Sequence, residues 1–415
     1  MPEQGEKLVI VGGGIIGLST AYYALKAGFE VTVLDRGGPS DPSCSSGNAG
    51  MIVPSHFTPL AAPGVMAQGL RWLLNPESPF AIKPGVSLDM ARWGWLFYLH
   101  SNAKHVADSR ELLCQLHLES RKLFTELAET EDFGLVTRGL LMLCKEEATL
   151  EEEAKLATQA KELGLNTEVL DGPGLTKLDP TIQMNVVGGV HFADDCHLDP
   201  ARLLAVLKQR ITEMGGQFQY NCPIDTLHRE NDRIRAVSGE SGEFEADQFV
   251  TAGGSWTPEL VKTLGLRLPM QPGKGYSMTL EQPVEQPTLC SLLAEARVAV
   301  TPMGTSLRIG GTMEIGGLNH EINPRRIKGI IKSVHDYFPA FSEKDFDGME
   351  PWVGLRPVSP DGLPYLGPIP GVDNLIIASG HAMMGLSLGP VTGKRVTGML
   401  SGDAPIPQLD PARFD

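Results

Sequence analysis

The stretch of residues 8–35 constrains this chain more than any other part of its sequence, because it runs from strand to glycine turn to helix to strand without interruption. Residues 8–11 are all apolar and predict a buried strand. The turn after them has Gly12, Gly14 and Gly17 in G-x-G-x-x-G spacing. In such a turn the first glycine permits the tight bend, the second lets a pyrophosphate approach the backbone, and the third lets the helix pack close to the strand.

A helix over residues 15–27, stopped by Gly28, and a β-branched strand over residues 31–34 complete a βαβ unit that ends in Asp35. Amide groups at the helix N-terminus can face phosphate charge, and Asp35 can accept hydrogen bonds from an adenosine ribose. An acid at this position disfavours a 2′-phosphate, and therefore NADP. The unit predicts a dinucleotide site and leaves NAD and FAD both open.

The length of 415 residues suits two domains, and the charge balance limits the partners that we expect. A net charge of −15 argues against a nucleic-acid partner and against attraction to anionic lipid. Six cysteines lie scattered without C-x-x-C or zinc-type spacing, which predicts free thiols in a reducing compartment and no metal site. No signal peptide precedes the first strand and no apolar run is long enough to span a bilayer, so we expect a cytoplasmic protein.

Two further stretches combine glycine with small polar residues, as backbone lying against a flat cofactor does. Residues 44–51 (CSSGNAGM) follow a loop rich in Gly, Pro and Ser, and either a flavin-facing loop or an ordinary surface turn fits them. Residues 249–256 (FVTAGGSW) predict an apolar strand that runs into a glycine pair. Near the C-terminus, a strand over residues 375–378 leads through Gly380 into a helix over residues 389–400, whose N-terminus can face an anion.

Between these blocks the sequence predicts a second domain. The aromatic stretch at residues 90–99 (MARWGWLFYL) predicts a buried helix of this domain, with a pocket cover or a membrane-facing surface as alternatives. We expect an α/β fold with a discontinuous Rossmann-type domain and a second, α+β domain built on a mixed, largely antiparallel sheet. Other helices are predicted over residues 103–130, 146–163, 201–214 and 324–337, and strands over residues 138–144, 188–195, 217–220, 275–280, 298–302 and 307–313.

Several motifs together resemble one flavoenzyme family. They are the N-terminal fingerprint, SSGNAGMI at 45–52, PLAAPGV at 59–65 with RWLL at 71–74, WVGLRPVSPDGLPYLGP at 352–368, and the GH…GLSLGP…GK stretch at 380–394. In this order they resemble the FAD-dependent D-amino acid oxidase superfamily, and within it the bacterial D-amino acid dehydrogenase (small-subunit type) branch with its D-hydroxyproline dehydrogenase relatives. The resemblance covers nearly the whole chain and implies FAD as the cofactor.

The resemblance also implies a division of the chain and a set of cofactor contacts. Residues 1–56, 186–262 and 350–402 would form the FAD-binding domain, residues 57–185 and 263–349 the substrate-binding domain, and residues 403–415 a tail. The residues expected at the cofactor are Gly12, Gly14, Ile15, Ile16, Gly17, Asp35, Arg36, Ser45, Ser46, Asn48, Ala49, Gly50, Met51, Gly253, Gly354, Gly380, Met384, Gly385, Leu386 and Ser387.

The candidates for the reacting end are Arg356, His381 and Tyr276. Arg356 matches the arginine that binds the substrate carboxylate in the superfamily, and a planar guanidinium suits a carboxylate because it can donate two parallel hydrogen bonds. A structural salt bridge is the alternative that the residue type alone leaves open. We expect His381 either to donate to the flavin or substrate or to be structural, and Tyr276, with Arg308, to contribute to the pocket wall.

The implied reaction takes hydride from the α-carbon of a D-amino acid to flavin N5 and gives an imine that hydrolyses to a 2-oxo acid. Two departures from the usual pattern are Asp35, where Glu is more common, and the run Ala382, Met383, Met384 in place of small turn residues. The second resembles relatives that oxidise cyclic D-imino acids such as D-proline or D-hydroxyproline.

The resemblance implies a quinone or another membrane acceptor, and with it a peripheral position at the inner face of the cell membrane. Two other functions stay open: an oxygen-using oxidase of glycine or sarcosine, and a flavin-holding electron-relay subunit of a complex. A homo-oligomer and accessory subunits are equally compatible with the sequence.

Overall fold

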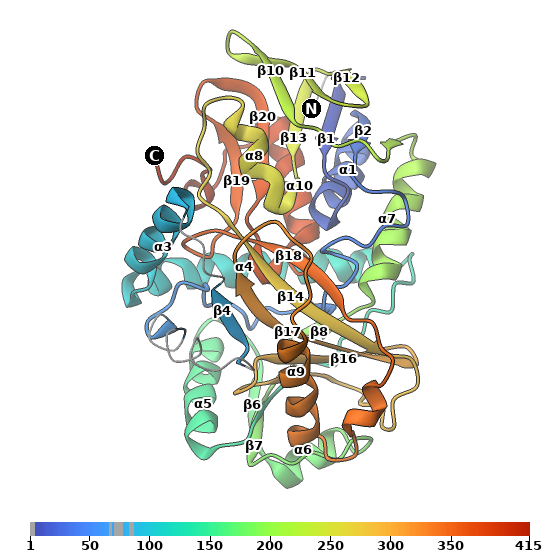
Figure 1. The fold of residues 1–415 in the computed structure, drawn as a ribbon, viewed down its shortest axis with the longest axis vertical. Coiled ribbons are helices and arrows are strands. Elements are labelled where there is room, and N and C mark those ends of the chain that lie inside the picture. The colour runs from blue at the N-terminus through green and yellow to red at the C-terminus, as the bar shows by residue number, and fades with distance from the viewer. Residues whose placement is uncertain (1–4, 66–68, 70–77, 83–86) are drawn as a thin grey trace.

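The computed structural model describes residues 5–65, 69, 78–82 and 87–415, and its two largest sheets lie in different halves of the molecule (Figure 1). The half that contains the N-terminal βαβ unit is uppermost in Figure 1, and the half with the larger sheet lies below it. Helix α4 (Ala103–Ala128) runs between the two halves and packs against the C-terminal helix α10 (Gly389–Leu400). The RWLL motif at 71–74 lies outside the described residues.

The upper sheet is the Rossmann-type sheet that the fingerprint predicts. Its six strands have the order β19-β20-β13-β1-β2-β9, and all neighbours are parallel except β19 and β20. Residues Leu8 and Ile10 of the central strand face one layer, and Val9 and Val11 face the other, so both faces of the sheet are buried. The strands are β1 (Lys7–Val11), β2 (Glu30–Leu34), β9 (Gln217–Gln219), β13 (Gln248–Thr251), β19 (Tyr365–Ile369) and β20 (Val372–Ser379).

Helices cover one face of this sheet, and a small sheet covers the other. Helix α1 (Ile15–Ala27) packs between α10 and α7 (Pro200–Glu213) on the first face. The second face carries the antiparallel strands β10 (Thr226–Glu230), β11 (Arg233–Gly239) and β12 (Gly242–Glu245), with α8 (Thr257–Lys262) beside them. This layered α/β arrangement confirms the expected fold class.

The lower sheet has nine strands and is mixed. Its order is β18-β14-β17-β16-β15-β5-β7-β6, with β4 also paired to β17, and only the β15–β5 and β17–β4 pairs are parallel. The strands are β4 (Phe80–Ile82), β5 (Leu140–Cys144), β6 (Thr167–Asp171), β7 (Gly188–Phe192), β14 (Gln271–Leu280), β15 (Cys290–Leu293), β16 (Val298–Met303), β17 (Ser306–Ile315) and β18 (Trp352–Val358).

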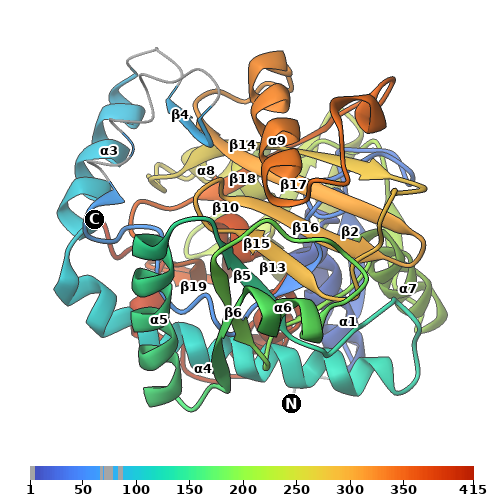
Figure 2. The same cartoon turned by 90° about the horizontal axis from the view of Figure 1, so that it is seen from below.

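Three helices accompany the lower sheet. Helix α9 (Pro324–Tyr337) covers β16 and β17 (Figure 2), and α5 (Glu147–Glu162) and α6 (Gly172–Leu178) pack near β5, β6 and β7. A short pair, β3 (Met51–Ile52) with β8 (Cys196–His197), connects the region of the 44–51 loop to the segment after β7. The opposite face of β14, β16 and β17 looks toward the upper half.

Two strands belong to a different domain from the one to which the expected boundaries assign them. Strands β7 and β18 belong to the nine-stranded sheet, whereas boundaries at residues 186 and 350 would assign both to the cofactor domain. The apolar residues of β18 gave no indication of which sheet they would join. The segments that form β6 and α6 were not predicted, because residues 167–178 have neither a clear helical nor a clear alternating pattern.

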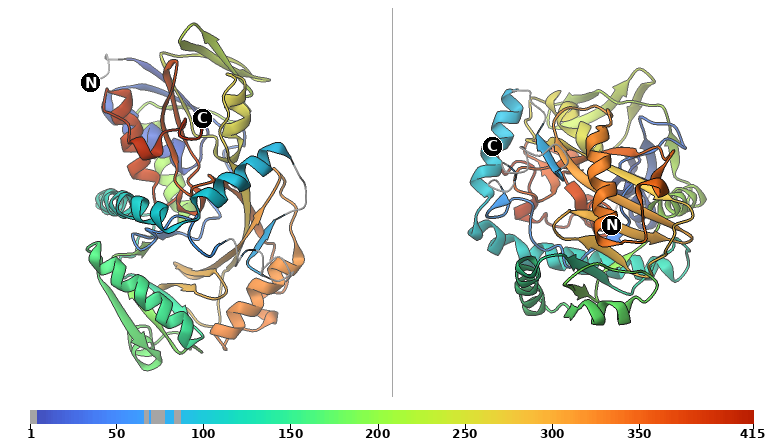
Figure 3. Two further views of the ribbon diagram at one scale, coloured as in Figure 1. Left: turned by 90° about the vertical axis from the view of Figure 1, so that its left-hand side faces the viewer. Right: turned by 60° about the horizontal axis from the view of Figure 1, so that its bottom comes forward.

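The aromatic helix α3 (Leu88–His100) is buried on one face only. Trp93 and Phe97 are buried, whereas Trp95 is 61% exposed and Tyr98 58% exposed. Figure 3 shows α3 on the outside of the molecule, at the level where the two halves meet. The prediction of a buried helix was therefore wrong for the outer face. None of the helices in the described ranges has the length and apolar character needed to cross a bilayer.

Candidate active site

The glycine turn has the geometry that its spacing predicts. Gly12 has a φ of +116°, a conformation that side chains with a Cβ rarely adopt, and a Cβ there would press against the Ala252 carbonyl. A Cβ at Gly17 would collide with the Gly12 carbonyl oxygen, so this glycine lets α1 pack close to the turn. Gly14 is the N-cap of α1, and because glycine has no side chain it cannot accept hydrogen bonds from the first amides of the helix.

Asp35 organises the turn from the end of β2. Its Oδ2 accepts a hydrogen bond from the Gly13 amide at 2.6 Å, and its Oδ1 accepts one from the Gly37 amide at 2.7 Å. The next residue, Arg36, places its guanidinium 4.2 Å from the ring centroid of Trp256. Asp35 thus holds the backbone of both neighbouring turns at the place where the sequence predicts the ribose. The sequence did not predict these two hydrogen bonds.

The 44–51 loop is fixed from both halves of the molecule. Ser45 Oγ accepts a hydrogen bond from the Ile15 amide at 3.0 Å, which satisfies the first amide of α1. Arg308 on β17 donates through Nη1 to the carbonyls of Ser46 at 2.8 Å and Asn48 at 3.1 Å. Arg308 is not among the residues that line the cavity described below, so it positions this loop and does not form the pocket wall that we expected.

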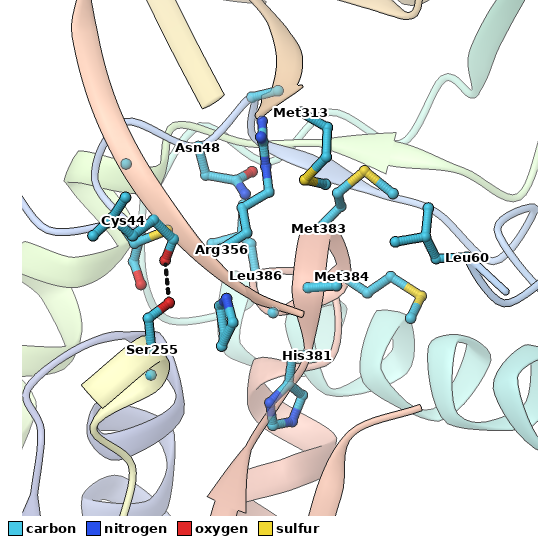
Figure 4. A pocket seen from close by; sticks show the side chains of 18 of the residues that line it. Cys44, Asn48, Leu60, Ser255, Met313, Arg356, His381, Met383, Met384 and Leu386 are labelled. Carbon is cyan, nitrogen blue, oxygen red and sulfur yellow. Dashed lines mark hydrogen bonds between the residues drawn. The ribbon is translucent and has the colours of Figure 1, made fainter. Parts of the chain in front are cut away.

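The C-terminal turn after β20 begins with Gly380 at a φ of +78°. The His381 ring points away from Arg356 (Figure 4), and its Nε2 lies 3.0 Å from Thr392 Oγ1 on α10. Burial lowers the pKa of His381 to about 3, so the imidazole is neutral. These contacts favour the structural alternative, because the ring joins the turn to α10 and does not face Arg356.

Ser387 lies behind the same turn and contacts a histidine that sequence reasoning missed. Its Oγ accepts a hydrogen bond from the Val53 amide at 3.0 Å and lies 2.7 Å from His117 Nδ1. His117 is fully buried in α4, and its Nε2 lies 3.4 Å from Met384 Sδ. No motif in α4 marked this residue, since a lone histidine on an apolar helix face gives no functional signal.

One cavity of about 1850 Å³ joins these elements. It extends from the glycine turn past the 44–51 loop to β17, β18 and the C-terminal turn. Gly17, Ser46, Gly50, Gly380 and Ser387 are not among its lining residues and shape the wall from behind. The expected cofactor residues that line it are Gly12, Gly14, Ile15, Ile16, Asp35, Arg36, Ser45, Asn48, Ala49, Met51, Gly253, Gly354, Met384, Gly385 and Leu386.

Arg356 lines the cavity from β18, on the side of the nine-stranded sheet. Its guanidinium covers Gly275, where any Cβ would collide with it, and Nη1 donates to the Thr312 carbonyl at 2.8 Å. Burial lowers the pKa of Arg356, yet the guanidinium stays cationic because arginine titrates so far above neutrality. Within the described part of the chain Arg356 forms no ion pair with a carboxylate. Such a cation on a cavity wall is a site for an anionic ligand.

The surroundings of Arg356 are apolar. Met313 and Met383 lie near each other beside Arg356 in Figure 4, with Leu60 on the far side of Met383. Met383 is 44% exposed although it lines the cavity, so its side chain has room to move. Cys44 also lies in this region, and burial raises the pKa of its thiol, which is therefore neutral.

Tyr276 lines the cavity, as expected of a residue of the pocket wall, but its side chain packs away from Arg356. Its side chain is buried in a cluster with Ile330 and Val334 of α9, on the face of the sheet opposite Arg356. The Tyr276 hydroxyl accepts a hydrogen bond from the Asn323 amide at 3.2 Å. Strand alternation explains the direction of the side chain, because Arg356 packs against the neighbouring position, Gly275, and Tyr276 therefore points to the other face of the sheet.

The cavity fits a flavin dinucleotide. A pyrophosphate-type turn lines it from the Rossmann-type sheet, the Arg356 guanidinium lines it from the nine-stranded sheet, and one continuous space of about 1850 Å³ includes both. Gly47 and Gly354 leave room for the Trp352 ring beside this space, because a Cβ on either would overlap the indole. Fold and site together define a two-domain flavoenzyme with a buried anion-binding end.

Comparison with known proteins gives the same class. Residues 7–399 match the family described as FAD dependent oxidoreductase (DAO), and the chain belongs to this family. It is 33% identical over 413 residues to a D-amino acid dehydrogenase of Methylobacterium nodulans, with 96% of each chain covered. A D-amino acid dehydrogenase of Vibrio atlanticus is 30% identical over 410 residues, again with 96% of each chain covered.

Solved structures share the fold at lower sequence identity. The glycine oxidase of Geobacillus kaustophilus superposes with a TM-score of 0.78 at 21% identity, covering 99% of this chain and 100% of that one. The L-proline dehydrogenase of P. horikoshii gives a TM-score of 0.74 at 18% identity, covering 100% and 98%. The FAD cofactor expected from the sequence resemblance is thus confirmed by the family.

Proposed function

We propose that this protein is an FAD-dependent D-amino acid dehydrogenase and that Arg356 binds the carboxylate of its substrate. The observation that carries the proposal is the cavity-facing Arg356 guanidinium, which has a backbone partner in Thr312 but no carboxylate partner among the described residues. The full-length similarity to proteins named D-amino acid dehydrogenase supports the reaction type.

The chain contributes binding and orientation to this reaction, and bound FAD supplies the hydride acceptor. Arg356 donates two parallel hydrogen bonds to the carboxylate and so fixes the α-carbon in one orientation. The short helix η3 (Ala382–Met384) and the rest of the C-terminal turn close the cavity near this position. The residues expected at the cofactor and the domain division are part of the same proposal, with β7 and β18 assigned to the substrate-binding domain.

The side chain of the proposed substrate is apolar or cyclic. Met313, Met383 and Leu60 offer it thioether and methyl groups, and methionine adapts to irregular shapes because its side chain is unbranched. D-Proline and D-hydroxyproline remain the cyclic candidates. We expect Met383→Ala to widen the accepted range toward larger D-amino acids without loss of FAD.

A quinone acceptor and peripheral membrane contact are proposed together. The outer face of α3 supports the contact, because Trp95 and Tyr98 stack at 5.8 Å between centroids while both stay exposed, and Leu88 is 90% exposed. Exposed Trp and Tyr suit the interfacial zone of a bilayer. A W95S/Y98S double variant should lose co-sedimentation with neutral lipid vesicles while its soluble turnover stays the same.

The test of the proposed function is anaerobic bleaching of the flavin by D-proline, D-hydroxyproline, D-alanine, their L forms and sarcosine. We expect rapid bleaching by D forms and reoxidation by a quinone analogue. Bleaching by sarcosine with rapid peroxide formation in oxygen would instead identify an oxidase. A flavin that none of these compounds bleaches would refute the dehydrogenase assignment in favour of an electron-relay subunit.

A further inference from the structure

A chain of three polar residues leads from the cavity into the protein interior. Ser55 Oγ lies 2.5 Å from Asp195 Oδ2 and 3.3 Å from His56 Nδ1, and the Ser55 amide donates to Asp195 Oδ1 at 3.0 Å. Ser55 and His56 line the cavity, whereas Asp195, in the segment between β7 and β8, is completely buried. Nothing in the carboxylate-binding role of Arg356 explains why a buried acid is connected to the cavity.

The hydrogen positions along this chain follow from donor counting. The Ser55 hydroxyl has a single hydrogen, and the 2.5 Å contact assigns it to Asp195 Oδ2. Ser55 Oγ can then only accept from His56, so Nδ1 of His56 carries the hydrogen and Nε2 carries the lone pair. The chain therefore ends in a proton acceptor on the ring of a residue that lines the cavity.

His56 lies between the two parts of the site. It is close enough to Arg297 for that charge to lower the pKa of His56, and close enough to His117 to lower the pKa of His117 in turn. Arg297 directly precedes β16, whose Ala299 pairs with Gly310 of β17, two residues before the Thr312 carbonyl that binds Arg356. His117 contacts Ser387 behind the C-terminal turn. Both neighbours thus place His56 near the reacting end of the cavity.

We propose that His56, Ser55 and Asp195 form a proton relay that removes the ammonium proton of the substrate before hydride leaves its α-carbon. The inference rests on the proposed function. An amino acid enters with a protonated amine, and only the neutral amine has the lone pair that forms the C=N bond as hydride departs. The relay converts R–NH₃⁺ and the Asp195 carboxylate into R–NH₂ and a neutral Asp195 carboxyl. His56 Nε2 takes the proton, Nδ1 passes its own to Ser55 Oγ, and Ser55 passes its hydrogen to Asp195.

Burial makes Asp195 a stronger proton acceptor than an ordinary carboxylate. Burial raises the pKa of Asp195 to about 7, so its carboxyl can exchange a proton near neutrality. Burial and the Arg297 charge lower the pKa of His56 to about 4, so the ring conducts the proton and does not retain it. The titratable and charged groups around the relay are Arg121, Cys114 and His117 on α4, Asp194 and Cys196 beside Asp195, Cys290 on β15, Arg297 before β16, and Glu153 on α5.

A binding experiment tests proton transfer without turnover. 2-Aminoisobutyrate has the carboxylate and ammonium of an amino acid but no α-hydrogen, so it cannot be oxidised. We expect the ¹³C carboxyl resonance of Asp195, assigned by its loss in Asp195→Asn, to move toward the protonated position when this compound binds the holoenzyme at pH 8. A resonance that stays at the ionised position in the saturated complex would overturn the relay.

Kinetics test the path. Asp195→Asn keeps an oxygen for the Ser55 amide, and Ser55→Ala removes only the connecting hydroxyl. We expect each to slow anaerobic flavin reduction about 100-fold at pH 7 and to abolish the inflection of its pH profile near neutrality. The matched control is Asp194→Asn, which removes a neighbouring carboxylate bound to the Asn166 amide at 2.6 Å. It should retain the rate and an inflection that moves only to slightly lower pH, because the Asp194 charge helps to raise the pKa of Asp195.

The outcomes separate the two proposals. A wild-type flavin that no D-amino acid bleaches refutes the proposed function itself. A wild type that is bleached, with Asp195→Asn and Ser55→Ala equal to it in rate and pH profile, leaves the function standing and overturns the relay. Retained Tm and FAD content in both variants will show that a slow rate does not reflect misfolding.

Discussion

Substituting Gly275 by alanine should weaken substrate binding without disturbing the cofactor. The guanidinium of Arg356 lies directly over Gly275, and a Cβ there would overlap its Nη1, Cζ and Nη2 atoms. The arginine must therefore move, and its hydrogen bonds to a bound carboxylate are lost or misaligned. A hydrogen bond that involves a charged group contributes about 1.5–3 kcal/mol, which corresponds to a roughly 10- to 150-fold rise in the dissociation constant.

The assay is an equilibrium titration of the holoenzyme with 2-aminoisobutyrate, followed by the change in flavin absorbance. Gly94→Ala is the matched control, because Gly94 lines the same cavity but a Cβ there meets nothing within 4 Å. We expect the control to bind as the wild type does, and both variants to contain a full complement of FAD. A Gly275→Ala dissociation constant within threefold of the wild-type value would refute the placement of the carboxylate on Arg356.

Three further predictions concern the parts of the site that hold the cofactor and the fold. Gly17→Ala should reduce FAD content and lower stability by about 1–3 kcal/mol, because the added methyl separates α1 from the glycine turn; flavin absorbance and Tm will measure this, and an unchanged holoenzyme would contradict it. Arg308→Met should cost about 1–3 kcal/mol and weaken FAD binding by freeing the Ser46 and Asn48 carbonyls, which flavin fluorescence on dilution will report; equal retention of FAD would count against the loop-positioning role. Burial lowers the pKa of His117 to about 3, so the unfolded chain binds an extra proton between roughly pH 6.5 and 3 and stability falls as the pH falls through that range. His117→Gln should therefore flatten the dependence of urea stability on pH between 6.5 and 4.5 by up to about 1.4 kcal/mol per pH unit, and identical slopes in both proteins would exclude a buried neutral His117.

The sequence predicted the cofactor end of the site well, for reasons that are local. A glycine turn between two apolar strands requires only neighbouring residues, and α1, β1 and β2 formed where the spacing placed them. The same holds for α4, α5, α7, α9 and α10, each of which has a clear helical repeat of apolar residues or an N-terminal capping signal.

The reacting end was less predictable because it depends on contacts between distant segments. Arg356 was identified by resemblance, but its environment depends on the pairing of β18 with β14, which places it over Gly275. The direction of the Tyr276 side chain was not predicted, because an aromatic residue in an alternating strand gives no indication of which face will be covered by a helix. Arg308 was misassigned for a related reason, since its partners are backbone carbonyls more than 250 residues away.

The Ser55, His56 and Asp195 chain gave no sequence signal at all. Ser55 and His56 are adjacent, but Asp195 lies 140 residues further on and reaches them only because β3 pairs with β8. Similarly, the outer face of α3 looked like core in the sequence, because two buried and two exposed aromatic residues share one apolar stretch. The sequence shows that a helix is apolar, whereas the exposure of each side chain depends on the elements that pack beside the helix.

The central claim, that Arg356 binds the substrate carboxylate, is tested most directly by comparing D-alanine with D-alaninol, which has a hydroxymethyl group in place of the carboxylate. The measurement is the second-order rate constant of anaerobic flavin reduction for each compound, in the wild type and in Arg356→Met. We predict that the wild type strongly prefers D-alanine and that Arg356→Met loses most of this preference, chiefly through D-alanine, while its FAD content stays the same. An unchanged preference for D-alanine in Arg356→Met would contradict the account.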